Sequence, residues 1–427
     1  MIVHRAAWVV RIAGPVIRDG WVAVEGGRIA DCGPVSAAPA GTPAPTPFDS
    51  GPFAILPALV NAHTHLEFSY TRGMIPPSGS FGEWVSALVA LRRKHPDPAA
   101  PQILDAVRSA IGQMRDSGTG LVGDISNTLV TLGPLQEAQM PARVFHEVLG
   151  FNLPDPGAVV RAACERLAAI EPSDLVRVNI TPHAPYSVAP AMFCEIARVL
   201  AAWREAVASI HLGESPEEIV FLRSGGGGIR AALESIGAWN TSWQPPGCGP
   251  VEYMDRFGLL TPRLLAVHGV QFGADDLARL RAAGATLVTC PRSNRWVGAG
   301  SPPVDEFYAS GVHVAIGTDS LASVEDLNLF SEMAQIRALG ADIPARAIVE
   351  SATRMGAEAL GFGEDYGTIE PGKRAALIAV RVPDGVDDVE EYLVSGIRPA
   401  DVGWLNERWP TPESRAPSPE PRRRGAP

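Results

Sequence analysis

Eight short apolar segments, each ending in polar residues, recur through the middle of the chain and alternate with segments of helical periodicity. The apolar segments are Ile55–His65, Leu121–Ser126, Arg143–Gly150, Val176–His183, Ala208–Glu214, Leu265–Val270, Thr286–Asn294 and Val312–Ser320. The helical segments are Phe81–Lys94, Pro101–Ser117, Pro156–Ile170, Pro190–Arg204, Ala274–Ala283 and Asn328–Leu339. Eight strand–helix units favour an α/β fold, the (β/α)8 TIM barrel, whose chemistry lies at the carboxyl ends of its strands. A doubly wound open sheet is the alternative, but no GxGxxG motif follows a strand. We interpret the four glycines at 225–228 as a loop.

The two ends of the chain share a different pattern. Near the N-terminus, short apolar runs alternate with Gly and Asp turns, and residues 367–382 repeat this character. We expect residues 1–54 and 366–409 to pair into one small β-sandwich domain beside a barrel of residues 55–365. The final segment, 410–427, holds six prolines and a triple arginine and predicts a disordered tail.

Charge and apolar patterning limit the partners. The chain has 36 basic and 47 acidic residues, a net charge of -11, which disfavours nucleic acid. No apolar run approaches the roughly 18 residues that a membrane-spanning helix needs. The N-terminal segment lacks the features of a signal peptide, and the five cysteines are scattered without a CxxC pair. We therefore expect a cytoplasmic protein with reduced thiols that acts on a small molecule, without nucleic-acid or membrane partners. A homodimer is possible.

Histidines and acids gather where the predicted strands end. His63 and His65 close the first predicted barrel strand, and alternate residues of a strand face the same side, so both imidazoles could bind one ion. His211 ends the fifth strand and Asp319 ends the eighth. If the barrel closes, these four groups meet. Three imidazoles and one carboxylate suit Zn²⁺ or Fe²⁺, with room for a water molecule.

Two further residues lie beside this predicted ligand set. Glu214 follows His211 by three residues and could accept and return a proton without binding the metal. His268 ends the sixth strand and could orient the water or polarise the electrophile. The alternatives are that Glu214 is an exposed carboxylate at a helix start, and that the histidines are ordinary core residues.

The motifs HTHLE, PHAPYS, HLGES, VHGV, CPRSN and GTDS, in this order, resemble the amidohydrolase superfamily. The similarity covers about residues 1–385 and is strongest to the cytosine-deaminase-like branch, which includes adenosylhomocysteine and aminodeoxyfutalosine deaminases and triazine chlorohydrolases. The resemblance implies a metal held by four residues, a proton-shuttling glutamate, a catalytic histidine and aspartate, and a histidine that contacts substrate. In this sequence they are His63, His65, His211 and Asp319 for the metal, Glu214, His268 and again Asp319 for catalysis, and His183 for substrate.

The lysine count bears on the number of metal ions. Binuclear members of the superfamily bridge two ions with a carboxylated lysine at the end of the fourth strand. Lys94 and Lys373 are the only lysines in the chain, so no lysine is available there. We expect one divalent ion per chain, with Zn²⁺ favoured over Fe²⁺.

Other polar residues at strand ends carry weaker arguments. Ser293 or Asn294 of the CPRSN motif could hydrogen-bond the loop after the eighth strand and fix Asp319. Glu147 ends the third strand and could contact substrate or be solvated, so it receives no role.

The resemblance and the ligand pattern favour hydrolytic deamination of an aminated purine nucleoside or related N-heterocycle, with an aminodeoxyfutalosine-like compound as the preferred substrate. Removal of chloride or hydrolysis of a cyclic amide at the same site is the alternative. A catalytically inactive, metal-bearing binding protein is the third hypothesis. Glu214 and His268 argue against it, because a structural metal site has no use for a proton shuttle.

Overall fold

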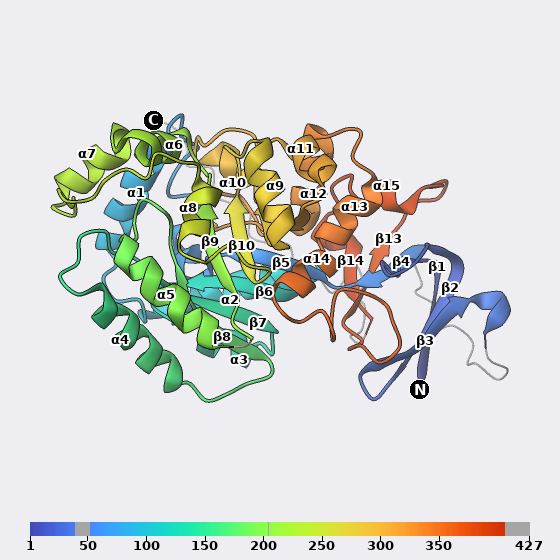
Figure 1. Ribbon diagram of the computed structural model, residues 1–427. Helices are drawn as coiled ribbons and strands as arrows, with labels where there is room; N and C mark the ends of the chain where they lie inside the picture. Colours follow the sequence, from blue (N-terminus) through green and yellow to red (C-terminus); the bar gives the residue numbers. More distant parts are fainter. Residues whose placement is uncertain (39–51, 204, 406–427) are drawn as a thin grey trace, which may run out of the picture.

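Strands from both ends of the chain form one six-stranded sheet in the computed structural model, which describes residues 1–38, 52–203 and 205–405 (Figure 1). The predicted tail at 410–427 lies outside these residues. The sheet has the order β14-β13-β4-β1-β2-β3. Its strands are β1 Ile2–Val9, β2 Ile17–Glu25, β3 Arg28–Pro34, β4 Phe53–Pro57, β13 Leu377–Arg381 and β14 Val402–Trp404. Because β4 pairs with β1 and β13, it links strands from the two ends of the chain. The described strands of this unit form a single sheet, and its sandwich form stays a prediction.

Eight further strands form two parallel sheets of four, ordered β5-β6-β7-β8 and β9-β10-β11-β12. These strands are β5 Leu59–Thr64, β6 Thr119–Ser126, β7 Ala142–Val148, β8 Val176–Pro182, β9 Ala208–Leu212, β10 Leu264–His268, β11 Thr286–Thr289 and β12 His313–Ile316. Each of the eight predicted segments overlaps one of them. The strand rhythm is therefore confirmed, and every strand of each sheet runs in the same direction.

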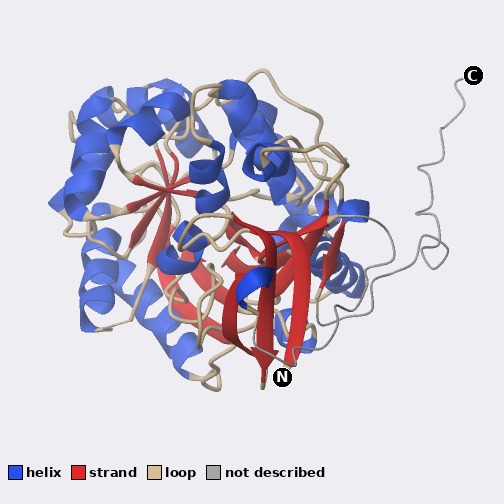
Figure 2. Ribbon diagram, turned by 90° about the vertical axis from the view of Figure 1, so that its right-hand side faces the viewer, coloured by secondary structure: helices blue, strands red, loops and turns tan. Residues whose placement is uncertain are grey.

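The two parallel sheets meet along both of their edges. At one edge Thr64 of β5 forms a β-bridge with Asp319, just beyond β12. At the other edge the backbone N–H of His211 donates to the carbonyl of His183 over 3.0 Å. Figure 2 shows the strands surrounded by helices. Apolar side chains from both sheets pack into one buried cluster, which includes Val60, Leu121, Phe145, Val267, Val288 and Ala315.

The segment Ile55–His65, predicted as one strand, is two strands in different sheets. Pro57 ends β4, and the N–H of Ala58 still donates to a carbonyl just before β13, over 2.9 Å. The N–H of Leu59 instead donates to the carbonyl just before β6, also over 2.9 Å. The chain therefore changes sheets at a proline, which has no N–H to continue a ladder of hydrogen bonds.

Helices occupy the connections between the parallel strands, and four more follow β12, the last of these strands. Their bounds are α1 Phe81–Arg93, α2 Pro101–Asp116, α3 Leu132–Glu137, α4 Pro156–Ala168, α5 Pro190–Ala202, α6 Pro216–Ser224, α7 Gly227–Ser235, α8 Pro250–Arg256, α9 Ala274–Ala283, α10 Pro291–Trp296, α11 Val304–Ser310, α12 Leu329–Leu339, α13 Ala345–Ser351, α14 Arg354–Ala359 and α15 Val389–Leu393. Three short 3-10 helices are η1 Val35–Ala37, η2 Leu66–Thr71 and η3 Pro399–Asp401. The six predicted helical segments correspond to α1, α2, α4, α5, α9 and α12.

Two further sequence predictions of local structure were wrong. The predicted strand Thr286–Asn294 is too long, because β11 ends at Thr289 and α10 begins at Pro291. Proline suits the first turn of a helix, where its missing N–H costs nothing. The glycines at 225–228 are not wholly a loop: Gly225 caps α6 in the left-handed region, and α7 begins two residues later.

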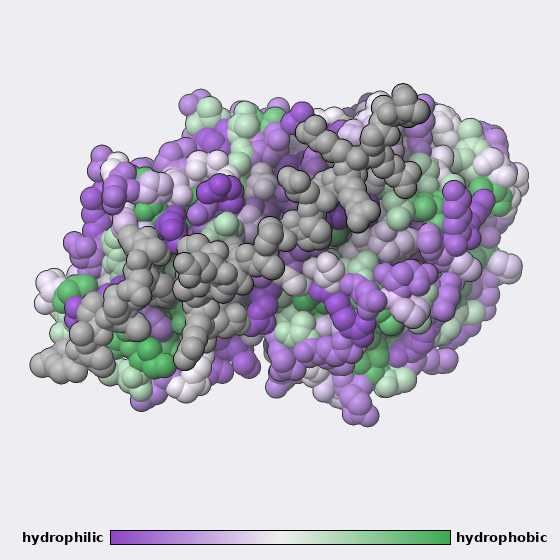
Figure 3. Space-filling view, turned by 180° about the vertical axis from the view of Figure 1, so that it is seen from behind, coloured by the Kyte–Doolittle hydropathy of each residue, from purple (hydrophilic) through white to green (hydrophobic). Residues whose placement is uncertain are grey.

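The surface and the cysteines show the following features. On the face in Figure 3, hydrophobic residues are interspersed with hydrophilic ones. No helix in the described ranges is long and apolar enough to cross a membrane. All five cysteines are free, and two of them, Cys248 and Cys290, are buried.

A buried arginine ties β7 to the C-terminal part of the chain. Arg143 is 2% exposed, and its Nε donates to the carbonyl of Leu360 over 2.6 Å. Its Nη1 donates to the side-chain oxygen of Asn179 on β8, and its guanidinium lies 5.9 Å from the ring centroid of Phe362. Burial lowers the pKa of Arg143 to about 10, so it stays charged at neutral pH. These hydrogen bonds must therefore offset the cost of burying a charge.

We predict that Arg143→Met lowers the free energy of unfolding by about 2–3 kcal/mol, because the Leu360 carbonyl and Asn179 lose their buried donor. Arg108→Met is the matched control, since Arg108 is an exposed residue of α2 that pairs with Glu137. That change should leave stability nearly unaltered. Chemical denaturation of both variants measures the difference, and equal stabilities would contradict the role given to Arg143.

Candidate metal centre

The four predicted metal ligands meet where the parallel strands end. His63 lies in β5 and His65 directly follows that strand, His211 lies in β9, and Asp319 follows β12. Nε2 of His65 is 3.5 Å from Oδ1 of Asp319, and Nε2 of His63 is 4.0 Å from the same oxygen. The ring centroids of His63 and His211 are 5.0 Å apart. All four residues are buried. The structure thus brings together residues from the first, fifth and eighth parallel strands.

The buried imidazoles leave nitrogen atoms without hydrogen-bond partners. Both ring nitrogens of His63 and Nε2 of His211 are in this position. A buried polar atom left without a partner costs about 1–3 kcal/mol. Burial, reinforced by the neighbouring imidazoles, holds the pKa of His63 well below its usual value, so its ring is neutral. A neutral, unpartnered imidazole such as that of His63, beside a carboxylate, is a donor that suits a divalent cation. At His211 burial lowers the pKa, but the neighbouring carboxylate of Glu147 outweighs burial and raises it to about 9.

Among the described residues, three groups of side chains each offer three ligand atoms within 4.8 Å of one another. The groups are His63, His65 and Asp319; His63, His211 and His268; and Glu147, His183 and His211. The first two groups share His63 and together contain the whole predicted ligand set plus His268. The residues present therefore fit one divalent ion, with further polar groups around it.

Backbone strain marks two of these positions. His268, the last residue of β10, has φ 78°, and Asp319 has φ 60°. Both lie in the left-handed region, which costs a non-glycine residue of the order of 1–3 kcal/mol. At Asp319 the backbone N–H donates to the carbonyl of His63 over 3.0 Å, and its own carbonyl accepts from the hydroxyl of Thr64 over 2.7 Å. These contacts to β5 hold the strained turn in place.

Two serines fix the Asp319 carboxylate: Ser293, for which the CPRSN motif predicted this contact, and Ser323, which lies outside the motif. The hydroxyl of Ser293 donates to Oδ2 over 2.5 Å, and the hydroxyl of Ser323 donates to the same oxygen over 3.1 Å. Oδ1 is left facing His63 and His65. The carboxylate is thereby oriented with one oxygen toward the imidazoles.

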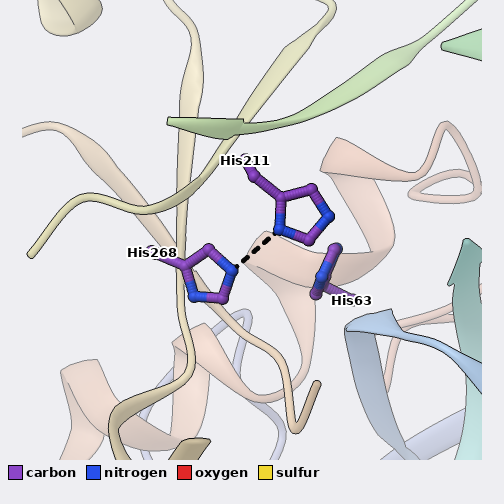
Figure 4. A group of neighbouring side chains, drawn as sticks. All are labelled: His63, His211 and His268. Carbon is purple, nitrogen blue, oxygen red and sulfur yellow. Dashed lines mark hydrogen bonds between the residues drawn. The ribbon is translucent and has the colours of Figure 1, made fainter. Parts of the chain in front are cut away.

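The other residue of that motif, Asn294, contacts His268 instead. Its Nδ2 lies 2.9 Å from Nδ1 of His268. Nε2 of His268 lies 3.0 Å from Nδ1 of His211, a contact that Figure 4 shows with His63 beside it. The same Nε2 is 3.6 Å from Oε1 of Glu214. His268 therefore lies between the predicted ligand His211 and the predicted proton shuttle.

Glu214 is not an exposed carboxylate at a helix start. It is 5% exposed and precedes Ser215, the N-cap of α6. Burial, with added repulsion from nearby acids, raises its pKa to about 8, although His211 opposes the shift. A carboxyl group with a pKa near neutrality can both donate and accept a proton at ordinary pH.

His183 follows β8 and lies on the other side of His211. Its ring centroid is 4.9 Å from that of His211, and its Nδ1 lies 2.5 Å from the hydroxyl of Ser187. The side chain is partly exposed. This leaves the second nitrogen of His183 available to a ligand beside the metal centre.

Sequence reasoning gave no role to Glu147, but the structure places it at the centre. Its Oε1 is 3.4 Å from Nε2 of His211, and its Oε2 accepts from Nδ2 of Asn127 over 2.8 Å. It is 5% exposed. Alternation along β7 could have found it: Phe145 packs in the cluster shared by both sheets, so the residue two positions later faces the same side.

Comparison with known proteins supports the fold. One relative, the 5-methylthioadenosine/S-adenosylhomocysteine deaminase of Moorella thermoacetica, is 29% identical over 92% of this chain and 90% of its own length. The aminodeoxyfutalosine deaminase of Deinococcus radiodurans is 32% identical over 72% of this chain and 73% of its own. A crystal structure of an adenosine deaminase from Xanthomonas campestris with bound zinc superposes with a TM-score of 0.76 at 27% identity, covering 94% of this chain and 90% of the other.

The sequence pattern of one family spans most of the chain. The amidohydrolase family pattern matches residues 54–401, which include both parallel sheets and every predicted site residue. The parallel strands, and relatives that match 92% and 72% of this chain, agree with this match. The chain belongs to the amidohydrolase family.

Proposed function

We propose that this protein is a metal-dependent deaminase that removes the exocyclic amine of a purine nucleoside or related N-heterocycle as ammonia. The observation that carries the proposal is the meeting of His63, His65, His211 and Asp319 beside the buried Glu214. The protein is a hydrolase of carbon–nitrogen bonds, since it belongs to the amidohydrolase family and its relatives are named as deaminases. Among substrates we favour one similar to aminodeoxyfutalosine.

One divalent ion per chain would be held by these three histidines and the aspartate. Zinc is favoured, because the ligand set suits it and the related Xanthomonas structure contains it; iron is the alternative. Such an ion would lower the pKa of a water molecule toward neutrality. Lys94 follows α1 and Lys373 precedes β13, so neither of the two lysines lies on a parallel strand, where one could bridge a second ion.

The protein's own residues would then move the protons. Glu214 takes a proton from the attacking water and delivers it to the ring nitrogen next to the reacting carbon. Oxygen from water bonds to that carbon. Asp319 takes the second proton of the water and passes it to the amine, the carbon–nitrogen bond breaks, and the amine leaves as ammonia. His268 donates a hydrogen bond to the charge that develops on the way.

The substrate would lie between two sets of side chains. Glu214 and His268 stand on one side, after β9 and at the end of β10, and His183 and Glu147 on the other, after β8 and on β7. We assign a substrate-binding role to His183. Its free nitrogen could hydrogen-bond an acceptor on the heterocycle.

The domain organisation and location are also proposals. We propose that the two parallel sheets close into one (β/α)8 barrel of residues 55–365, and that residues 1–54 and 366–409 form a separate β-sandwich domain. Hydrogen bonding at both sheet edges and the shared apolar cluster support closure. The switch of sheets at Pro57 moves the first boundary by about three residues. A cytoplasmic location and a homodimer stay predictions.

The direct test is a screen of aminated purines and their nucleosides for ammonia release by zinc-loaded protein. We expect ammonia and the corresponding oxo compound in equal amounts from at least one 6-aminopurine nucleoside. Chlorinated triazines and cyclic amides serve as the competing substrates. Turnover of one of those, with no ammonia from any aminated heterocycle, would replace deamination by the alternative activity.

Asp319→Asn should reduce turnover about 100-fold or more, because the amide is a weaker, neutral ligand and a poor proton acceptor. The melting temperature should change little, since the hydroxyls of Ser293 and Ser323 can still donate to the amide oxygen. The same change at the exposed Asp275 of α9 is the control. Elemental analysis and turnover are measured together, and an Asn variant with normal metal content and rate would remove Asp319 from the site.

Glu214→Gln keeps the size of the side chain but removes its titratable proton. Turnover should fall about 10²–10⁴-fold, the usual contribution of a general acid–base group, while bound metal stays near one ion per chain. Glu217→Gln, three residues along the same segment, is the matched control and should keep its activity. Loss of metal together with turnover would make Glu214 a ligand, and full activity would exclude the proton shuttle.

A further inference from the structure

Glu218, a residue outside the predicted site, turns back from the first turn of α6 toward Glu214. The helix has Ser215 as N-cap, and the hydroxyl of Ser215 accepts from the N–H of Glu218 over 3.3 Å. In a usual capping box the third-residue glutamate accepts from the N–H of the N-cap. Here the carboxylate reaches further back. Its Oε1 accepts from the N–H of Gly213 over 2.9 Å, and its Oε2 accepts from the N–H of Glu214 over 3.1 Å.

Glu218 is fully buried, so these two bonds account for both of its oxygens. A buried carboxylate that accepts from backbone N–H groups makes stronger hydrogen bonds than a neutral acceptor does. These two hydrogen bonds therefore fix the Glu218 carboxylate against the backbone of residues 213 and 214. They also hold that backbone in place. Few other surroundings would offset the cost of burying this group.

The other side of the same segment is fixed by the chain that follows β10. The carbonyl of Gly213 accepts from the N–H of Gln271 over 2.8 Å, and the carbonyl of Leu212 accepts from the N–H of Gly269 over 3.1 Å. Gly213 has φ 62°, and a Cβ there would lie 2.5 Å from the ring of Phe272. The turn can thus hold only glycine, and the direction of the next side chain, Glu214, is set by contacts on both sides.

We propose that Glu218 is a positioning residue. Through the two backbone N–H groups it holds the Glu214 carboxyl group next to the imidazole of His268. The proposal rests on the proposed function, because it gives Glu214 the proton-transfer role. Glu214 lies 3.6 Å from His268. General acid–base catalysis needs the group within hydrogen-bond reach of the proton it moves, so a small displacement here should lower the rate more than substrate binding.

The charge of Glu218 also acts on Glu214. Burial raises the pKa of Glu214 first, and the carboxylates of Asp319, Glu218 and Glu217 add to it, while His211 lowers it. Burial raises the pKa of Glu218 itself to about 7, so its charge is present above that pH. In that range a neutral residue at 218 should lower the pKa of Glu214 and move the pH–rate limb that Glu214 controls to lower pH. The groups that face Glu214 from the surrounding elements are His211 on β9, His268 on β10, Asp319 after β12, Tyr186 after β8, and Glu217 and Glu218 on α6.

Two substitutions separate geometry from charge. Glu218→Gln keeps the length of the side chain but has a single acceptor oxygen, so one backbone N–H loses its partner and the charge is lost. Glu218→Asp keeps the charge but is one methylene too short to reach both N–H groups. Glu217→Gln is the matched control, since Glu217 lies in the same turn, carries the same charge, and is partly exposed.

The first measurement is hydrogen exchange of the peptide that contains Gly213 and Glu214, followed by mass spectrometry of the metal-loaded protein. We expect exchange at these amides to rise about tenfold in both Glu218 variants and to stay at the wild-type rate in Glu217→Gln. Peptides from β8 serve as an internal reference for global stability. Unchanged exchange in both Glu218 variants would overturn the proposal, whatever the activity.

The second measurement is the rate at which the enzyme releases ammonia from a 6-aminopurine nucleoside. Both Glu218 variants should lose about 10–100-fold in kcat with KM changed little and metal content retained. The pH–rate limb should move to lower pH in Glu218→Gln and stay in place in Glu218→Asp. If the Glu218 variants match Glu217→Gln in kcat, the positioning role is wrong and the proposed function stands. If Glu214→Gln itself stays active, the proton shuttle fails and this proposal with it.

Discussion

The pairing between the ends of β5 and β12 is the contact on which the site depends. The hydroxyl of Thr64 donates to the carbonyl of Asp319 across 255 positions of the chain, and the carbonyl of His63 accepts from the N–H of Asp319. Without this pairing between the ends of β5 and β12, the carboxylate of Asp319 would not reach His63 and His65. Parallel strands put their carboxyl ends on one side, so residues far apart in sequence can meet there.

Much of the surrounding structure offsets the cost of assembling buried polar groups. Asp319 and His268 adopt strained backbone conformations, and Asp319 is held by two serine hydroxyls and by the backbone of β5. Asn294 contacts His268 from α10. The CPRSN segment thus supports the site without belonging to the predicted ligand set. Two neighbouring residues of one short helix orient Asp319 and His268.

The rhythm of apolar segments and their polar ends was enough to predict the eight parallel strands and the set of residues that meet. The exact ends of the strands and helices could not be predicted, because single residues such as prolines set them. Pro57 divides a run of apolar residues that reads as one strand, and Pro291 starts a helix inside a segment predicted as a strand. The inward direction of Glu147 follows from alternation only once β7 is placed in the fold. Glu218 could not be found from spacing alone, because its contacts depend on the left-handed turn at Gly213.

The relatives and the geometry answer different questions. The family match establishes a hydrolase fold over residues 54–401, whereas the distances between side chains indicate which atoms could hold an ion. Three overlapping groups of ligand atoms share His63 or His211. The deamination proposal requires that the ion occupy the group that includes Asp319, because Glu214 and His268 then stand next to the attacking water.

The most direct measurement is an anomalous difference map at the zinc edge from crystals of the zinc-loaded protein. The account predicts one peak per chain, about 2.0–2.3 Å from a ring nitrogen of each of His63, His65 and His211 and from a carboxylate oxygen of Asp319. A peak held instead by Glu147, His183 and His211, or two peaks of similar height in one chain, would contradict it.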